Sequence, residues 1–430
     1  MIRKITQGEK AQNYNSTTNR DRHQDGFREP NFFEKFLLPK NGLLIFSSML
    51  IFVYTIAPTA AYLFAPVGDS FLLLSLITLC AVGSMLIGSQ IYLFDPRFKP
   101  SAQRLYIDQR TFTGLTWIIF FAFILITFST APSIPIWTAL RGGATSNELS
   151  QERGDFLKGR EGAGIALLYI STFLVNTIVP YSIVLLYRAK SSLRHWAAAI
   201  FFLFCISFMQ KALFLNLILP LLVFLAVTRK LSSKIFLPVI FGTIGILLLT
   251  TALSLAGEGG DTSNTGSSDY LTALYAPSNP IDYFIWRAAA VPIFTATDTL
   301  VVHSEQFGSR PLMGATSTLI SSILGIERIN LERFVFEHQF GGWNDTANSN
   351  AVFCIDAYVN FGWPGVVIFG LIIGLTFRWF KISTDIGFQS LWLIFALVLF
   401  SAPLIGMLLS NGFAYMLLHG LYIRVDRHGT

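Results

Sequence analysis

Uncharged apolar runs constrain the fold of this chain more than any other feature of its sequence. Five runs are long enough to cross about 30 Å of hydrocarbon as a helix: Leu43 to Phe64, Phe71 to Phe94, Phe112 to Ala131, Ala163 to Tyr187 and Ile235 to Ala256. Each must be helical, because lipid offers no partner to an open strand edge. With 53% hydrophobic and 13% charged residues, the chain is predicted to be an all-α polytopic membrane protein.

Three further regions complete the predicted bundle. Val352 to Phe377 forms one more span, with Asp356 near its outer end and a kink predicted at Trp363-Pro364-Gly365. Ala197 to Thr228 and Leu391 to Ile423 are long enough for two helical hairpins, although each half is short for a full crossing. The prediction is therefore about ten transmembrane helices.

Basic residues in the short loops predict the orientation of these helices. With the N-terminus inside, the inner segments are residues 1–42, 95–111, 188–196, 229–234, 378–387 and 424–430. They hold 22 of the 31 lysines and arginines. The outer segments hold the other nine: Arg141, Arg153, Lys158, Arg160, Lys211, Arg287, Arg310, Arg328 and Arg333. Both termini are thus predicted to be cytoplasmic.

The same spans divide the chain into four parts. Residues 1–42 form a polar cytoplasmic tail without the basic region and adjoining apolar core of a cleaved signal peptide, and residues 6–28 are expected to be disordered. The other parts are a membrane bundle (43–256) with an outer loop (132–162), a large outer loop (257–351), and C-terminal helices with a short cytoplasmic tail (352–430).

The large outer loop has three predicted sections. Gly257 to Ser268 has the composition of a flexible linker. Tyr283 to Val302 is apolar and about as long as a span, but a crossing here would place Arg378 and Lys381 outside, so an interfacial or buried helix is predicted. Ser309 to Asn350 is predicted to be a polar lid that carries titratable groups.

Several classes of protein are disfavoured by what the sequence lacks. Ionisable groups are almost absent from the spans, whereas ion-coupled transporters keep such groups near the midplane. The sequence contains no zinc-type Cys/His cluster, no phosphate-binding Gly-Lys-Ser/Thr loop and no Gly-x-Ser-x-Gly elbow. Its three cysteines predict no disulfide framework. The working groups are therefore expected at the outer surface.

Outer cations and acid/base groups each allow a plain structural interpretation and a functional one. Arg153 belongs either to a solvated surface helix or to a substrate site, and Lys211 either extends to the interface from its hairpin turn or meets a phosphate. His338, in the predicted lid, is either a surface side chain or a catalyst.

Four local motifs carry a resemblance to a known family. They are Glu152-Arg153-Gly154 shortly before Gly162-Ala163-Gly164; Gln210-Lys211-Ala212 between short helices; Phe284-Ile285-Trp286-Arg287; and Asn348-Ser349-Asn350 followed by Ala357-Tyr358-Val359-Asn360-Phe361-Gly362-Trp363-Pro364-Gly365. The chain resembles the bacterial O-antigen and oligosaccharide repeat-unit polymerases, the Wzy-like family, over roughly residues 40–425. The related O-antigen ligases share this architecture.

The resemblance implies a GT-C-like bundle in the bacterial inner membrane that transfers glycan from undecaprenyl diphosphate to another lipid-linked repeat unit. It implies a diphosphate site formed by Arg153, Lys211, Arg287 and Arg310, since a diphosphate needs cations at the membrane surface. His338, Glu337 and Asp345 are the groups available to activate or orient the acceptor hydroxyl.

The implied enzyme uses no metal or cofactor. Its implied partners are lipid-linked glycans, the bilayer, and a chain-length regulator and flippase of the same pathway, with no nucleic acid. Two alternatives stay open: a ligase that transfers glycan to lipid A core, and a flippase or other transporter of lipid-linked oligosaccharides.

Overall fold

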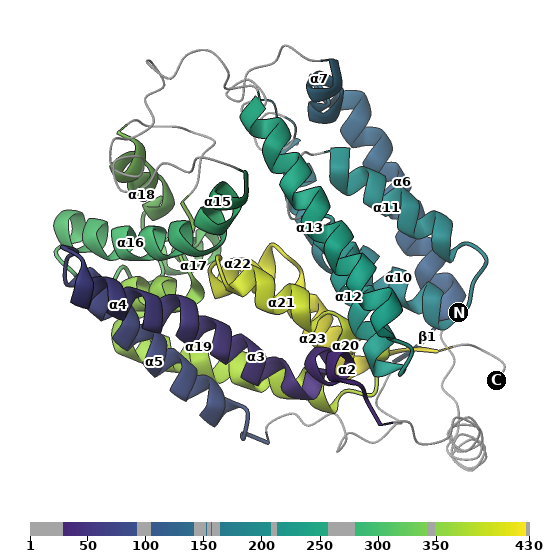
Figure 1. Ribbon diagram of the computed structural model, residues 1–430, viewed down its shortest axis with the longest axis horizontal. Helices are drawn as coiled ribbons and strands as arrows, with labels where there is room; N and C mark the ends of the chain where they lie inside the picture. The colour runs from purple at the N-terminus through teal and green to yellow at the C-terminus, as the bar shows by residue number, and fades with distance from the viewer. Residues whose placement is uncertain are drawn as a thin grey trace.

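The computed structural model describes residues 29–92, 105–141, 152, 156, 164–207, 213–256, 280–341 and 349–426. These residues are almost entirely helical (Figure 1). The first half contains α2 (Phe32–Leu37), α3 (Pro39–Ile51), η1 (Phe52–Ile56), α4 (Ala57–Phe64), α5 (Ser70–Gly88), β1 (Leu105–Asp108), α6 (Gln109–Thr130), α7 (Pro135–Arg141), α9 (Ile165–Phe173), η4 (Leu174–Ile178), α10 (Val179–Arg188), α11 (Arg194–Ser207), α12 (Leu215–Val227) and α13 (Ser233–Ala256).

The second half of the described chain begins within the predicted large outer loop and continues into the bundle. It contains α15 (Pro280–Ile285), η5 (Trp286–Ala290), α16 (Val291–Phe307), α17 (Thr318–Leu324), α18 (Leu331–Phe340), α19 (Phe353–Ile382), α20 (Ile386–Ser390), α21 (Trp392–Leu399), α22 (Leu404–Leu409), α23 (Phe413–Tyr422) and β2 (Ile423–Asp426). Elements labelled η are π-helical turns.

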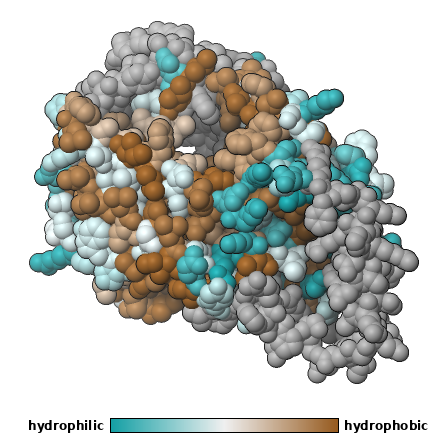
Figure 2. Space-filling view, turned by 60° about the horizontal axis from the view of Figure 1, so that its bottom comes forward, coloured by the Kyte–Doolittle hydropathy of each residue, from teal (hydrophilic) through white to brown (hydrophobic). Residues whose placement is uncertain are grey.

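Five helices of the described chain are long and apolar enough to cross a membrane: Pro39–Phe64, Ser70–Gly88, Gln109–Thr130, Ala166–Arg188 and Phe353–Ile382. They coincide with five of the predicted spans, and the chain is an all-α membrane protein by this measure. Hydrophobic side chains cover much of the surface that Figure 2 colours.

The predicted count of ten spans is not confirmed. The two predicted hairpins do consist of paired short helices, α11 with α12 and α21 with α22 and α23. However, α11 has 14 residues and α12 has 13, which is about 20 Å of helix against about 30 Å of hydrocarbon. Each of these helices is therefore short for a full crossing.

The tightest contact in the bundle joins α5 to α19 through glycines. A side chain at Gly370 would place its Cβ 2.6 Å from the Cβ of Ser84, and Gly374 and Gly88 have equally little room beside the facing backbone. Gly370 and Gly374 are spaced as in small-residue contacts between membrane helices. α19 is kinked at Gly362 (φ 65°, ψ −158°), which confirms the kink predicted beside Trp363.

One end of the bundle gathers the segments predicted to be inner. Gln109 Nε2 donates to the Leu185 carbonyl (2.8 Å), Arg378 donates to the Ser89 carbonyl (3.0 Å), and Asn31 Nδ2 donates to the Leu231 carbonyl (2.7 Å). At the same end β1 pairs in parallel with β2, with Leu105 opposite Ile423. Residues 105 and 423 therefore lie at the same end of the bundle.

The short C-terminal helices lie at the centre of the molecule. In Figure 1 the yellow helices α20 to α23 lie between a group formed by α3, α4, α5 and α19 and a group formed by α6, α10, α11, α12 and α13. Contacts of α20 with α10 and α12, and of α21 with α3, tie the two groups together. The beginning of α19 lies at the end of the bundle opposite β1 and β2, which here is called the outer end.

Candidate functional site

Four of the seven predicted site residues lie within the described chain. Arg287, Arg310, Glu337 and His338 are all exposed. Arg153, Lys211 and Asp345 lie outside the described residues, as do the predicted linker and most of the outer loop at 132–162. Arg287 is on η5, within one continuous helix from Pro280 to Phe307 whose buried face includes Thr295 to His303. This agrees with the interfacial or buried helix predicted for residues 283–302.

The structure does not bring Arg287 beside Glu337 and His338. α18 packs on the C-terminal half of α16, where the Phe307 and Phe334 rings are 5.9 Å apart and Gln339 Nε2 donates to Asp298 Oδ2 (2.7 Å). Arg287 is eleven residues before Asp298, or about 16 Å along a helix. A substrate would have to extend from one to the other.

Arg310 is placed differently. His303 Nε2 is 2.8 Å from the Arg310 carbonyl, and two residues further on the Leu312 N–H donates to the Val359 carbonyl of α19 (2.9 Å). The exposed Arg310 side chain therefore starts from backbone fixed beside the outer end of α19. Of the two described cations predicted for diphosphate binding, Arg310 is nearer in sequence than Arg287 to the Leu312–Val359 contact with α19.

Beneath these exposed groups is a network that we call the outer polar cluster. Its members are Asp298, Thr316, Glu332, Gln339, Ser349, Asn350, Asp356 and Asn360. They come from α16, from the segment before α17, from α18, and from the beginning of α19 with the residues just before it. Tertiary contacts thus join residues that are far apart in the sequence.

In the first half of the outer polar cluster, hydrogen bonds link a carboxylate, an amide and a hydroxyl. Asp298 is only 1% exposed, and it accepts the hydrogen bond from Gln339. The Ser349 hydroxyl donates to Gln339 Oε1 (2.8 Å), and the Ser349 N–H donates to the Glu332 carbonyl (3.3 Å). These bonds hold the chain entering α19 against α18.

In the second half, two carboxylates are bonded to amide donors. Asn360 Nδ2 donates to Asp356 Oδ1 (3.0 Å) and to Thr316 Oγ1 (2.8 Å). With its amide turned to satisfy both of its polar atoms, Asn350 donates to both oxygens of Glu332 (2.8 and 3.0 Å).

Carboxylates gathered in one polar cluster are frequent at sites of proton transfer. Glu332 is on the same helix as Glu337 and His338 but is turned toward α19. From the sequence, Asp356 was expected near the outer end of its span and Asn360 belonged to a motif, but no site role was predicted for Asp298, Glu332 or Asn360. A usable signal was the i, i+4 pair of polar residues, Asp356 and Asn360, at the start of an otherwise apolar helix.

A second polar feature lies in the middle of the bundle. Asn216 Nδ2 donates to Asn176 Oδ1, and Asn176 Nδ2 donates to Asn411 Oδ1, both at 2.6 Å. Asn176 is in the π-helical turn η4, Asn216 is at the beginning of α12 and Asn411 is in the α22–α23 turn. In another π-helical turn, η1, the Tyr54 hydroxyl donates to the Phe400 carbonyl (2.6 Å). The Tyr54 bond satisfies a backbone carbonyl inside the protein, as membrane burial requires.

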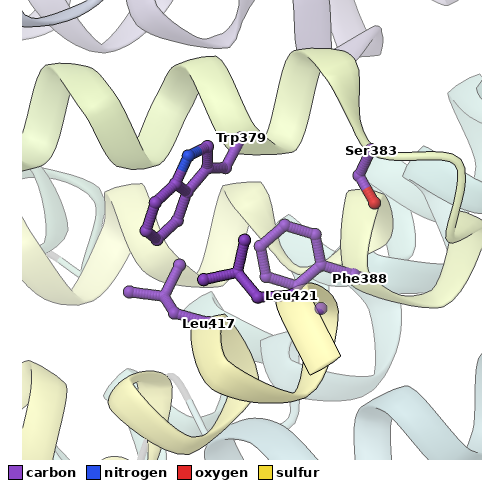
Figure 3. Close-up of a pocket in the computed structure, with 6 residues that line it drawn as sticks. Trp379, Ser383, Phe388, Leu417 and Leu421 are labelled. Carbon is purple, nitrogen blue, oxygen red and sulfur yellow. The ribbon is translucent and has the colours of Figure 1, made fainter. Parts of the chain in front are cut away.

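A small pocket at the inner end is lined by Trp379, Ser383, Phe388, Leu417, Gly420 and Leu421. Figure 3 shows the Trp379, Phe388, Leu417 and Leu421 side chains turned toward a common space. The empty space is about 200 Å³, part of it open to solvent. Apart from the Ser383 hydroxyl its lining is apolar, so it suits neither an oligosaccharide nor a diphosphate.

Within the described residues, no group of three or more His, Cys, Asp or Glu side chains could hold a metal ion. Comparisons of the chain with protein-family models, with curated proteins and with solved structures find no match.

Proposed function

We propose that this protein polymerises oligosaccharide repeat units linked to undecaprenyl diphosphate, at the outer face of the bacterial inner membrane. The observation that carries the proposal is the outer polar cluster, which holds the carboxylates of Asp298, Glu332 and Asp356 at one end of the bundle. The basic segments predicted to be cytoplasmic gather at the opposite end. Acid/base groups are thus available where a lipid headgroup would present its sugar.

The depth of the outer polar cluster suits this chemistry. In a polyprenyl diphosphate sugar the reacting carbon is bonded to the diphosphate, which lies at the membrane surface. Asp356 is in the first turn of a helix long enough to cross the membrane. A base at this depth can reach an acceptor hydroxyl beside the reacting carbon, whereas a base far out in the large loop could not.

In the proposed reaction, Glu332 accepts the proton of an acceptor hydroxyl while Asp356 holds the neighbouring amide and hydroxyl groups in place. The hydroxyl oxygen attacks the anomeric carbon of the donor sugar, and the bond from that carbon to the diphosphate breaks. Undecaprenyl diphosphate leaves with its negative charge, which Arg310 balances by charge-assisted hydrogen bonds. Arg287 lies about 30 Å from Arg310 along the continuous helix, so it would bind another part of the substrate. Glu337 and His338 are the second pair proposed for orienting or deprotonating the acceptor.

An O-antigen ligase would use the same donor and the same depth, so it is the second candidate. A transporter of lipid-linked oligosaccharides would need a cationic cavity inside the bundle. The polar groups at mid-bundle within the described residues are instead neutral asparagines bonded to one another. This favours an enzyme.

The deciding experiment uses purified full-length protein in liposomes containing an undecaprenyl-diphosphate-linked repeat unit, with the products separated by size. A ladder of lipid-linked oligomers supports the proposal. No ladder, together with transfer to lipid A core, indicates the ligase. Movement of the donor between leaflets without any new glycosidic bond overturns the enzyme assignment.

A further inference from the structure

The segment between α16 and α18 has inverted polarity. The exposed positions of α17 carry Leu319 (49% exposed), Ile323 (72%) and Leu324 (55%) beside Thr318 and Ser322, and its buried position carries Ser321. Met313 and Ile326 extend the exposed apolar surface at either end. A water-facing helix shows the opposite arrangement, with polar side chains outward. The predicted polar lid is therefore apolar on the surface of its first half.

The polar groups of this segment find partners within the protein. The Ser321 and Ser322 hydroxyls both donate to the Thr318 carbonyl (3.1 and 2.8 Å). The Ala315, Ser317, Ile326 and Ile329 N–H groups donate to the carbonyls of Leu312, Gly314, Ser321 and Ala315. Hydrocarbon requires such internal pairing, whereas an aqueous loop does not.

Contacts with α19 fix the depth of the segment. The Leu312 and Met313 N–H groups donate to the Val359 and Asn360 carbonyls (2.9 and 2.8 Å), so the segment reaches the second turn of a membrane-spanning helix. Gly314 has no room for a side chain between Ile320 and Phe361. From Trp363 onward α19 exposes apolar side chains of its own, including Val367 and Ile368. The apolar surface of the segment therefore continues that of a transmembrane helix.

Charge marks both ends of the segment. Residues 311–326 contain no charged side chain, while Arg310 precedes them and Glu327 and Arg328 follow, all three exposed. Charged residues that flank an apolar stretch are typical of segments anchored at the membrane interface.

We propose that residues 311–326 are embedded in the bilayer leaflet at the outer end of the bundle, with the exposed face of α17 against hydrocarbon chains. The segment enters and leaves on the same side. It places Thr316, a member of the outer polar cluster, directly behind a lipid-contacting surface. This proposal stands without the proposed enzymatic activity.

The test is spin-label accessibility in liposomes. Cys80, Cys205 and Cys354 are replaced by alanine in the full-length protein, and the monodispersity of this background is checked by size exclusion. Single cysteines are then introduced at Ile323 and Leu319 and labelled. Ile368, exposed on α19, is the lipid control, and Glu305, exposed on α16, is the aqueous control.

Labels at Ile323 and Leu319 should collide more with oxygen than with a water-soluble nickel chelate, as at Ile368, whereas the label at Glu305 should show the reverse. Nickel accessibility at both α17 positions equal to that at Glu305 would place the segment in water and overturn the proposal. Protection of both positions from both reagents would show a protein contact, such as a second copy, and overturn it equally.

Discussion

The outer polar cluster and the polar network at the inner end are built from similar side chains but combine them differently. At the inner end the Tyr181 hydroxyl donates to Asp385 Oδ2 (2.7 Å) and lies 3.1 Å from His419 Nε2, while Asp385 Oδ1 accepts from the Gly387 N–H (2.8 Å). A single carboxylate there is bonded to a phenol and a backbone N–H. At the outer end three carboxylates, Asp298, Glu332 and Asp356, belong to one cluster.

This difference separates a structural role from a functional one. A carboxylate that caps a helix and accepts a phenol hydrogen bond stabilises the fold. A carboxylate held beside another carboxylate costs stability when both are ionised, and proteins keep such pairs mainly where chemistry uses them. We therefore expect substitutions at the inner network to reduce stability and substitutions at the outer polar cluster to reduce activity.

The largest effect is expected for Asp356→Asn and Glu332→Gln. Each keeps the shape of the side chain. Glu332→Gln removes the proton acceptor and Asp356→Asn removes the charge that holds Asn360 and Thr316 in place, so polymer formation should fall by about 100-fold or more. The unfolding temperature should stay unchanged or rise, because like-charge repulsion is relieved. Initial rates of polymer formation and thermal unfolding in detergent measure the two quantities.

The matched control is Asp385→Asn at the inner end. It should lower the unfolding temperature while the rate per folded molecule stays near that of the natural protein. If Asp385→Asn abolishes polymerisation of the folded protein, or if Asp356→Asn only destabilises, the contrast between the two ends is wrong.

The next effect concerns the outer cations. Arg310→Ala should lower the rate by about 100-fold, since it removes a charge-assisted contact to the leaving diphosphate, and Arg287→Ala should match it only if the diphosphate binds at η5 instead. Lysine at either position should rescue only in part, because the bidentate geometry of the guanidinium is lost. Arg194→Ala is the inner-end control: Arg194 lies over the Tyr187 ring (5.8 Å), and its loss should leave the rate unchanged.

A smaller and purely structural effect is expected for Tyr181→Phe. Removing the hydroxyl deprives Asp385 of a donor and leaves His419 without its 3.1 Å neighbour. Leaving buried polar groups unsatisfied costs about 1–3 kcal/mol of unfolding free energy. Tyr106→Phe, at an exposed position of β1, is the control. Equal unfolding temperatures for the two variants would show that the inner network contributes nothing.

The smallest effect is expected for His338→Ala. If Glu332 is the base, an exposed His338 only helps to orient the acceptor, and the rate should fall by about tenfold or less. Complete loss of polymerisation with intact binding of the lipid-linked donor would instead make His338 the catalyst. That result would move the reaction from the outer polar cluster to the exposed face of α18.

The fold was predictable from the sequence wherever the length of an uncharged apolar run determines that a helix spans the membrane. The span Phe112 to Ala131 contains no charge and only needs to be long enough, and the kink beside Trp363 follows from Pro364 and its glycines. The hairpins were harder, because composition does not distinguish α12, with 13 residues, from half of a longer span. The beginning of α12 and the α22–α23 turn depend on a partner, Asn176, that no local pattern reveals.

The candidate site was less predictable than the fold. Exposed charges such as Arg310 and His338 are visible in the sequence as charges in a polar loop. Glu332 looked equivalent to them, and only the docking of α18 on α16 and α19 turns it toward Asp356. The apolar face of α17 was likewise hidden by its brevity, since seven residues are too few for a clear periodicity.

The pairing of β1 with β2 sets an order for assembly of the protein. Leu105 is made early, yet its partner Ile423 is synthesised 318 positions later. Until then the edge of β1 has no strand to pair with, and the helices between must already be inserted with both ends on the correct side. Pairing of β1 with β2 is thus a late step that requires the intervening helices to be in place. A chain shortened before Ile423 could not form this pair.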